Sequence, residues 1–310
     1  MAGVTVRMPF VRRAAALRAL VLAALSVAIA AAALAAAAPA RAEAPERVVA
    51  LTPFTANILA QLGVTPVAVA EPAATEEKLS PRLRGAQRLA MSHPNGPNLE
   101  QLVALRPDAV FSSPVWRAGT PKIQNLGIRV YDSLDPQRLG TVPIGIKKIA
   151  KIVGREAQGV ALANRVQREY RAASAGIRKH PRVLLVLGLA QYTLAMLGNS
   201  WGGDIIEAAG GELVTKNIKP IGRTSEGAVV GNLSNEAVVR MNPDVIIVVP
   251  HGAADEVPAI ARYYRNFAPW RKTKAARTGR IYVPTDDLLL QATSDPASLI
   301  RKVRREYLKN

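Results

Sequence analysis

The clearest feature of the hydrophobic pattern is a unit of 14 residues that occurs twice. The first copy, residues 98–111, reads NLEQLVALRPDAVF, and the second, residues 234–247, reads SNEAVVRMNPDVII; they align without a gap at an offset of 136 residues. In each copy, apolar positions with helical spacing precede a proline, and a β-branched apolar run follows it. Each copy therefore predicts a helix that ends before the proline and a strand that is buried on both faces.

Polar residues at the start of each copy support the same interpretation. Asn98 and Ser234 can cap the helix, and Glu100 and Glu236 fall in its first turn, where the helix dipole favours an acidic side chain. Because one helix–strand unit is used twice, far apart in the chain, we expect two similar α/β lobes.

Short apolar runs alternate with helical patterns through most of the remaining chain. This alternation predicts two doubly wound, Rossmann-like lobes with parallel sheets, over residues 43–141 and 181–310, and a ligand cleft between them. Residues 142–180 lack a strand pattern and are expected to connect the lobes. Within them, residues 156–179 read as one amphipathic helix of roughly 36 Å, which would make the connection rigid. Residues 71–97 are polar and proline-rich and predict an irregular loop.

The first 42 residues have the pattern of a targeting segment. Arginines precede an apolar run from Ala19 to Ala38, and Ala40-Arg41-Ala42 fits a processing site, so we predict a cleavable signal peptide over residues 1–42. A transmembrane anchor is the alternative. The chain contains no cysteine, which excludes disulfides, thiolate metal sites and the lipid-bearing cysteine of bacterial lipoproteins. We expect an exported, non-lipidated protein of a periplasm.

The chain is strongly basic, with a formal net charge of +18. The first 42 residues carry five arginines and no acidic residue, so the remainder keeps about +13. Such a charge can indicate nucleic-acid binding, but export and the scatter of basic residues along the helices argue against it. Two interpretations stay open: a solvated surface, and contact with an anionic ligand or a membrane-proximal partner.

Ligands in open α/β sheets bind beyond the carboxyl ends of the strands, so residues that follow the predicted strands are candidates for a site. His251 follows the second repeat strand, between Pro250 and Gly252, and is a candidate ligand of a cleft molecule or metal, or else a hydrogen-bonded loop histidine. His93, shortly before the first repeat helix, has the same two interpretations. Met91 nearby could supply a thioether ligand or pack in the core.

Aromatic and arginine side chains extend this set of candidates. Trp116, Tyr192 and Trp201 could stack on a planar ligand or serve in packing. Arg117 and Arg223 could hold a carboxylate or be solvated. Catalysis finds little support, because the chain has no G-x-S-x-G, H-E-x-x-H or P-loop motif and no G-x-G-x-x-G after its first strand. A binding protein is therefore expected rather than an enzyme.

Four segments together resemble the class III substrate-binding proteins of ABC importers, which take up ferric siderophores, haem or corrinoids. They are RVVALTPFTANILAQLGVTPVAVA, PNLEQLVALRPDAVFSS, GGDIIEAAGGELV and SNEAVVRMNPDVIIV, and the resemblance covers almost all of the chain after residue 42. In that family two glutamates, one per lobe, dock into arginine pockets of the permease dimer in the inner membrane. Glu100 and Glu236 occupy the matching positions.

Residues 242–288 are similar to the haem-receptor branch of this superfamily, in which the histidine of a P-H-G-like turn ligates haem iron. The resemblance implies that role for His251. The methionine that supplies the second ligand in that branch aligns with about Asn95 here, a departure from the pattern, and His93 or Met91 could substitute for it.

The resemblance implies a monomeric periplasmic protein without an intrinsic cofactor, which captures an iron complex, haem first of all, and delivers it to an ABC permease. A ferric siderophore or a corrinoid is the alternative cargo. For a siderophore, recognition would fall to Arg117, Arg223, Tyr192 and the tryptophans Trp116 and Trp201. A secreted α/β enzyme with an unfamiliar site is a further alternative.

Overall fold

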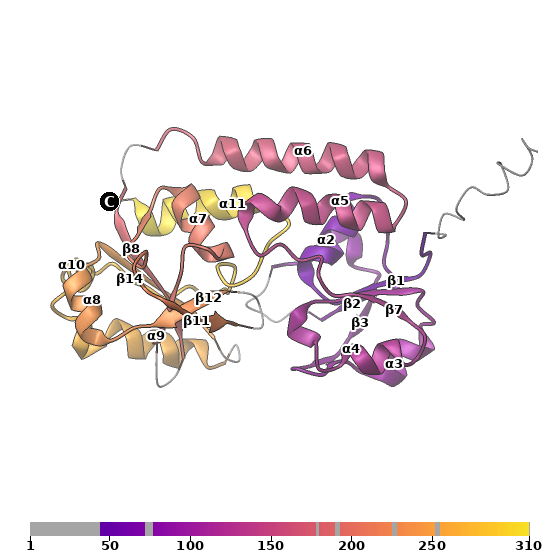
Figure 1. Ribbon diagram of the computed structural model, residues 1–310, viewed down its shortest axis with the longest axis horizontal. Helices are drawn as coiled ribbons and strands as arrows, with labels where there is room; N and C mark the ends of the chain where they lie inside the picture. The colour runs from indigo at the N-terminus through magenta and orange to yellow at the C-terminus, as the bar shows by residue number, and fades with distance from the viewer. Residues whose placement is uncertain are drawn as a thin grey trace, which may run out of the picture. The chain divides into compact units, whose positions relative to one another are not determined.

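The computed structural model describes residues 44–71, 77–177, 180–189, 193–224, 228–251 and 255–309. Residues 44–310 form one compact unit built on two sheets with helices on both of their faces (Figure 1). The predicted signal peptide lies outside the described residues. Within the described ranges, no helix combines the length and the apolar character needed to cross a bilayer.

The sheet of the first lobe has five strands in the order β3-β2-β1-β6-β7, and every neighbouring pair is parallel. The strands are β1 (Val48–Ala50), β2 (Ala68–Ala70), β3 (Gln87–Leu89), β6 (Ala109–Phe111) and β7 (Arg129–Tyr131). This confirms the parallel, doubly wound prediction for the first lobe.

The predicted irregular loop over residues 71–97 was wrong in part. It contains β3, a short 3₁₀ turn η1 (Pro81–Leu83), and the small antiparallel pair β4 (Met91–Ser92) and β5 (Gly96–Pro97). These elements are two or three residues long and β3 has two exposed positions, so no hydrophobic periodicity marks them in the sequence.

The sheet of the second lobe is mixed, which corrects the expectation of a parallel sheet. Its parallel part is β8 (Arg182–Gly188), β10 (Glu212–Leu213), β13 (Val245–Pro250) and β14 (Ile281–Tyr282). Its antiparallel part is β9 (Thr193–Met196), β11 (Pro220–Arg223) and β12 (Val229–Asn232). The second repeat strand, β13, pairs with β8 over six residues and is fully buried, as its β-branched run predicted.

The helices form two groups, one on each face of the sheets. One face carries α2 (Pro53–Gln61), α5 (Val142–Ile152), α6 (Glu156–Ala173), α7 (Trp201–Ala209) and α11 (Pro296–Val303). The other carries α3 (Leu99–Ala104), α4 (Thr120–Gln124), α8 (Asn235–Met241), α9 (Val257–Arg265) and α10 (Lys274–Arg277). On the first face one cluster of buried apolar side chains runs through both lobes, whereas on the second face each lobe has a cluster of its own. The lobes thus share a core on the α5–α6 side and are separate on the α3–α8 side.

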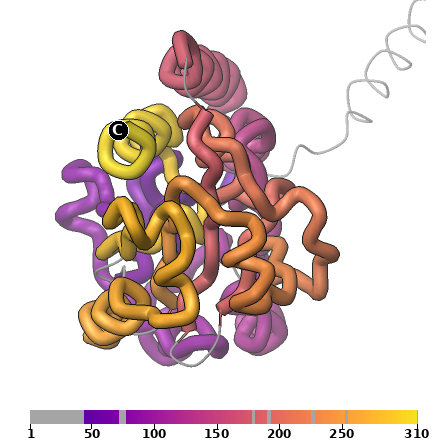
Figure 2. The backbone as a smooth tube through the Cα atoms, turned by 90° about the vertical axis from the view of Figure 1, so that its left-hand side faces the viewer, coloured from indigo at the N-terminus to yellow at the C-terminus, as the bar shows by residue number. Residues whose placement is uncertain are grey.

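The connection between the lobes consists of the two helices α5 and α6, and α6 is shorter than the helix predicted over residues 156–179. Helix α6 ends at Ala173, so its 18 residues span about 27 Å. It packs against both α5 and α11, and it lies outermost in the molecule (Figures 1 and 2). A Cβ on Gly159 of α6 would lie 2.1 Å from that of Ala150 of α5, so this glycine permits the close approach of the two helices.

The two copies of the repeat begin and end in the same way. The side chain of Asn98 accepts a hydrogen bond from the backbone of Gln101 (3.0 Å), and Ser234 caps α8 in the same manner. Both copies then leave the helix through a residue with positive φ at the same repeat position, Arg106 (46°) and Asn242 (42°). These caps explain why the helices are short and why each strand follows at once.

The repeat aspartates fasten each copy to the strand beside it. Asp108 accepts a hydrogen bond from the backbone N–H of Arg47 (2.8 Å), just before β1, and Asp244 accepts one from Arg182 (2.8 Å), at the start of β8. The Arg47 guanidinium in turn donates to the carbonyl oxygen of Leu105 at the end of α3 (2.7 Å). The two copies of the repeat therefore share hydrogen-bond contacts as well as a sequence pattern.

Candidate functional site

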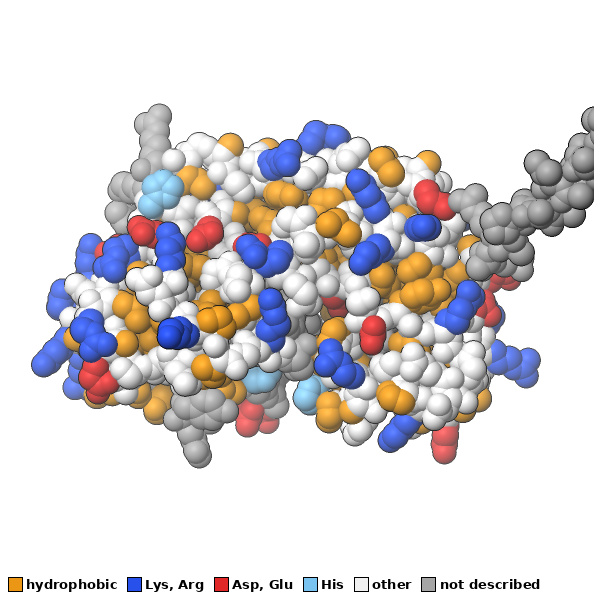
Figure 3. All heavy atoms as spheres, viewed as in Figure 1, with side chains coloured by type: hydrophobic (Ala, Val, Ile, Leu, Met, Phe, Trp, Pro, Cys, Tyr) orange, Lys and Arg blue, Asp and Glu red, His pale blue; other side chains and the backbone are white. Residues whose placement is uncertain are grey.

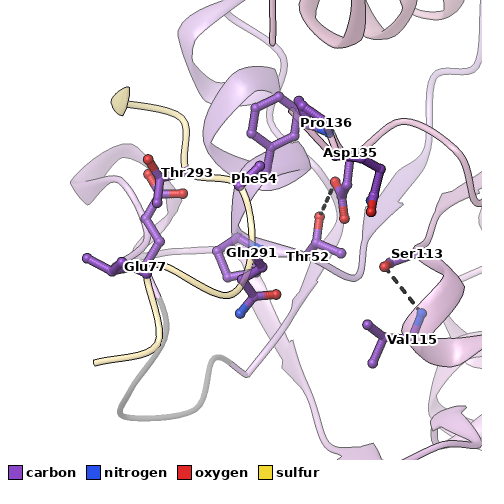
Figure 4. A pocket seen from close by; sticks show the side chains of 13 residues that line it. Thr52, Phe54, Glu77, Ser113, Val115, Asp135, Pro136, Gln291 and Thr293 are labelled. Atoms are coloured by element: carbon purple, nitrogen blue, oxygen red, sulfur yellow. Dashed lines mark hydrogen bonds between the residues drawn. The ribbon is translucent and has the colours of Figure 1, made fainter. Parts of the chain in front are cut away.

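The loops that follow β1 and β6 meet a segment of the second lobe, residues 288–293, at a narrow pocket (Figure 4). Polar side chains line much of it: Thr52, Glu77, Ser113, Asp135, Gln291 and Thr293. The space that they leave admits about one water molecule. The pocket lies at carboxyl ends of strands, where the sequence predicted a ligand site, and residues of both lobes line it, so it is called the floor between the lobes here.

Glu77 joins the two lobes at this floor. Its carboxylate accepts hydrogen bonds from the backbone N–H of Ser294 (3.0 Å) and from the Ser294 hydroxyl (2.5 Å). Asn57 of α2 holds the neighbouring backbone, since its side chain accepts a hydrogen bond from the Ser80 N–H (2.7 Å). Burial raises the pKa of Glu77 above the ordinary glutamate range, although the hydrogen bonds from Ser294 oppose this shift.

The variant Glu77→Gln tests this raised pKa, because its stability can be compared with that of the wild type as pH changes. The folded protein binds the Glu77 proton more tightly than the unfolded chain does, so this group stabilises the fold below the unfolded-state pKa and the contribution is lost as pH rises through the folded-state value. Measured over a pH range from about 4.5 to 8, the free energy of unfolding of the wild type relative to Glu77→Gln is expected to fall as pH rises. Urea unfolding across this range measures it.

The control for this experiment is Glu169→Gln, which neutralises an exposed glutamate on α6. Its stability should run parallel to that of the wild type across the same pH range. Parallel curves for Glu77→Gln and the wild type would show instead that the Glu77 pKa is the same in the folded and unfolded protein.

A second polar contact joins the lobes on the α7 side. The guanidinium of Arg138 donates to both carboxylate oxygens of Asp204 (2.7 and 2.6 Å), and the backbone N–H of Leu139 donates to Asp204 as well (2.9 Å). A two-pronged arginine–carboxylate pair has a defined geometry, so it fixes the first turn of α7 against the segment that leads into α5.

His251 lies where the sequence predicted it, directly after β13. Its backbone N–H donates to the carbonyl oxygen of Gly188 (3.0 Å), which continues the pairing of β13 with β8, and its side chain is exposed. The three residues after it lie outside the described ranges. Among the described residues, no three histidine, aspartate or glutamate side chains gather as a metal site.

The structure brings His93 and Trp116 together in the first lobe. Their rings meet edge to face with centroids 6.0 Å apart, and the Trp116 indole donates to the carbonyl oxygen of Leu51 (3.1 Å) at the end of β1. His93 is exposed and Trp116 is half-buried, whereas Met91 is half-buried against the core of the α3 side. Histidine side chains are visible on both lobes at the lower edge of the boundary between them (Figure 3).

Of the two interpretations of Trp201, ligand stacking and packing, the structure supports packing. Its side chain is only 2% exposed, and its indole donates to the carbonyl oxygen of Leu288 (2.9 Å), so it packs α7 against the segment behind the pocket. Arg117 and Arg223 are exposed, which agrees equally with ligand binding and with solvation, and their role stays a prediction. Tyr192 lies outside the described residues.

The predicted docking glutamates are both exposed, in the first turns of α3 and α8. These helices lie on the side of the molecule where the lobes have separate cores. Hydrogen bonds from its own backbone N–H and from the Ser234 hydroxyl lower the pKa of Glu236, so this carboxylate is ionised at neutral pH. Each lobe thus carries a glutamate at the same position of the same short helix.

Sequence reasoning missed Glu77, Asp135 and Gln291 at the floor between the lobes. Ser294 is 217 residues from Glu77 along the chain, and no spacing or motif connects them. The sequence offered one indirect signal: Ser113 and Asp135 follow predicted strands of the first lobe, and ligand sites lie at such strand ends.

The sequence pattern of the periplasmic binding protein family matches residues 48–288, which span both sheets and the connecting helices. The chain belongs to this family. The predicted recognition as a periplasmic binding protein is therefore confirmed.

Known members of the family extend this result. The high-affinity heme uptake system protein IsdE of Staphylococcus aureus (strain MRSA252) is 26% identical over 197 residues, which are 62% of this chain and 64% of IsdE, so the match spans less than two thirds of that relative. An ABC transporter substrate-binding protein from Listeria monocytogenes EGD-e superposes with a TM-score of 0.71 at 22% identity, covering 85% of this chain and 99% of its own. The structure of S. aureus IsdE complexed with heme superposes with a TM-score of 0.68 at 23% sequence identity, and it covers 85% of this chain and 99% of its own. The two-lobed fold is therefore shared.

Proposed function

We propose that this protein captures haem in the periplasm and delivers it to an ABC permease. The observation that carries the proposal is His251, exposed at the carboxyl end of β13 and hence on the side of the sheet where α/β proteins bind ligands. A neutral imidazole is a favoured axial ligand of haem iron. The heme uptake protein IsdE, which matches this chain over 197 residues, supports the same cargo.

The first lobe would supply the opposite wall. His93 is exposed beside Trp116 and is the candidate for the second axial position, with Met91 as the alternative from the same β4–β5 segment. The Trp116 ring can lie along a porphyrin face, and Arg117 directly after it can bind a propionate carboxylate. Because the floor pocket admits about one water molecule, haem would bind above it, nearer to the exposed histidines.

Delivery requires a permease, and the repeat supplies a matched pair of anionic groups for it. Glu100 and Glu236 project from equivalent helices, one on each lobe, and an arginine pocket on each half of a permease dimer would receive them.

The absorption spectrum of haemin tests the cargo. Wild-type protein titrated with haemin should give a shifted Soret band that saturates at one haem per chain. We expect His251→Ala to lose this shift or to raise the dissociation constant at least about tenfold, which corresponds to about 1.4 kcal/mol. His180→Ala, an exposed histidine at the start of the second lobe, is the matched control and should titrate as the wild type does. An unshifted wild-type spectrum would contradict haem binding.

A ferric siderophore is the second candidate cargo, and the adjacency of Trp116 and Arg117 on one turn favours it. An aromatic ring beside a guanidinium suits a planar anionic chelate, in which iron is already fully ligated. Quenching of tryptophan fluorescence by ferric siderophores, without any response to haemin, would select this candidate.

A further inference from the structure

The segment from residue 257 to 280 is unusually basic. It holds seven arginines and lysines, and no acidic residue occurs between residues 257 and 285. Six of the seven side chains are exposed and are called the basic surface here: Arg262, Arg265, Arg271, Lys272, Lys274 and Arg277. Lysine and arginine side chains gather on the side of the molecule where α8 and α10 lie (Figures 1 and 3).

The basic surface is fixed to α8, the helix that carries Glu236. The Trp270 indole is fully buried and donates to the Asn235 side chain at the start of α8 (3.2 Å). The backbone N–H of Lys274 donates to the side chain of Asn242 at the end of α8 (2.7 Å). Because both ends of α8 hold the basic segment, these charges keep a fixed position relative to Glu236.

Most charges of the basic surface have no acidic partner. Among the described residues, the surface makes one ion pair, between Lys274 and Asp244 (2.7 Å). Arg262, Arg265, Arg271 and Lys272 form none with any residue that the structure describes. Like charges held close together repel each other, so such a surface favours a polyanionic partner.

A groove beside the basic surface adds apolar contacts to the charge. Arg265 and Arg271 stand at its edge, and the rings of Phe267, Tyr282 and Tyr307 line it. It encloses about 1150 Å³, open solvent included. Guanidinium groups bind phosphate in two-pronged fashion, and tyrosine and phenylalanine rings suit the boundary between headgroups and acyl chains.

We propose that the basic surface, with this groove, binds the anionic phospholipid headgroups of a bilayer. This goes beyond cargo capture: it would hold the protein on the membrane and raise its concentration near the permease. The link to a permease rests on the proposed function, whereas the lipid contact does not. Each basic side chain near an anionic bilayer contributes about fivefold to the affinity, so several acting together give measurable binding.

Vesicle sedimentation with the full chain tests the proposal. The protein should bind vesicles of phosphatidylcholine with phosphatidylglycerol at a ratio of about 7:3, release them when salt rises from about 50 to 500 mM, and leave pure phosphatidylcholine vesicles unbound. The variant Arg265→Gln/Arg271→Gln/Lys272→Gln should lose at least about tenfold in affinity. All three side chains are exposed, so circular dichroism and thermal unfolding should match the wild type.

The control variant removes the same charge elsewhere: Lys147→Gln/Lys148→Gln/Lys151→Gln, on α5, is expected to bind within about twofold of the wild type. Equal losses in both variants would overturn the proposal, because net charge alone would then explain binding. Binding to pure phosphatidylcholine, or displacement from the vesicles by millimolar inorganic phosphate, would overturn it too, the latter in favour of a free-anion site. Haemin titration of the same variants separates this result from the cargo proposal, since both should bind haemin normally.

Discussion

The variant Glu100→Lys/Glu236→Lys is expected to bind haemin as the wild type does and to lose delivery to the permease by at least about 100-fold. The two side chains are exposed, and neither is among the residues proposed to contact haem, so haem binding should be unaffected. Reversing a charge that faces an arginine pocket replaces attraction by repulsion, which costs several kcal/mol at an interface. Each single reversal should give an intermediate loss, since one lobe can still dock.

Haem-stimulated ATP hydrolysis by the reconstituted permease measures this effect. The control pair Glu169→Lys/Glu212→Lys reverses the same number of exposed glutamates away from α3 and α8 and should stimulate hydrolysis normally. Undiminished stimulation by the Glu100/Glu236 variant would show that the repeat glutamates are ordinary first-turn helix acids.

Replacing Trp201 by alanine is expected to destabilise the fold by about 3–5 kcal/mol. The indole is 2% exposed, and its loss would leave a cavity behind α7 and free the carbonyl of Leu288. Replacing Trp116 by alanine should cost less, about 2 kcal/mol or below, because this ring is half-buried. The effects on haem affinity should be the opposite. Trp116→Ala should weaken haem binding, whereas the milder variant Trp201→Phe should bind haem as the wild type does.

Urea denaturation followed by haemin titration of each folded variant separates these two roles. If Trp201→Phe lost haem affinity while its unfolding free energy stayed unchanged, Trp201 would be a ligand-binding residue after all. If Trp116→Ala left haem binding intact, the wall of the site would lie elsewhere in the first lobe.

The repeat made much of this fold predictable. Asn98 and Ser234 cap their helices as expected, and the β-branched run after Pro243 became the fully buried strand β13. These features depend on local chemistry within about 15 residues, which sequence patterns report well.

Other features depend on contacts that the sequence does not encode locally. The antiparallel strands β9, β11 and β12 have the same apolar character as parallel ones, so direction could not be inferred from composition. Trp201 looked like a ring available to a ligand because its carbonyl partner, Leu288, lies 87 residues away. The predicted 24-residue helix is longer than α6, which ends at Ala173 and is followed by Gly176 with a positive φ of 72°.

In the candidate site, too, features set by local sequence were predictable and contacts between distant segments were not. His251 was placed correctly because a strand, a proline and a glycine define that turn in the sequence. The pairing of His93 with Trp116, and the contact of Glu77 with Ser294, needed the structure because each joins segments that are separate along the chain. The lobe boundaries predicted at residues 141 and 180 stay a prediction, because α5 and α6 share one core with both lobes.

The most direct measurement of the central claim is a competition titration of the wild-type protein, in which haemin, ferric siderophores and cobalamin are added singly and against one another. Haem delivery predicts a saturable Soret shift at one haem per chain that neither competitor reduces at tenfold excess. Displacement of haemin by a ferric siderophore or by cobalamin, or tight binding of either with no haemin response, would contradict haem as the cargo.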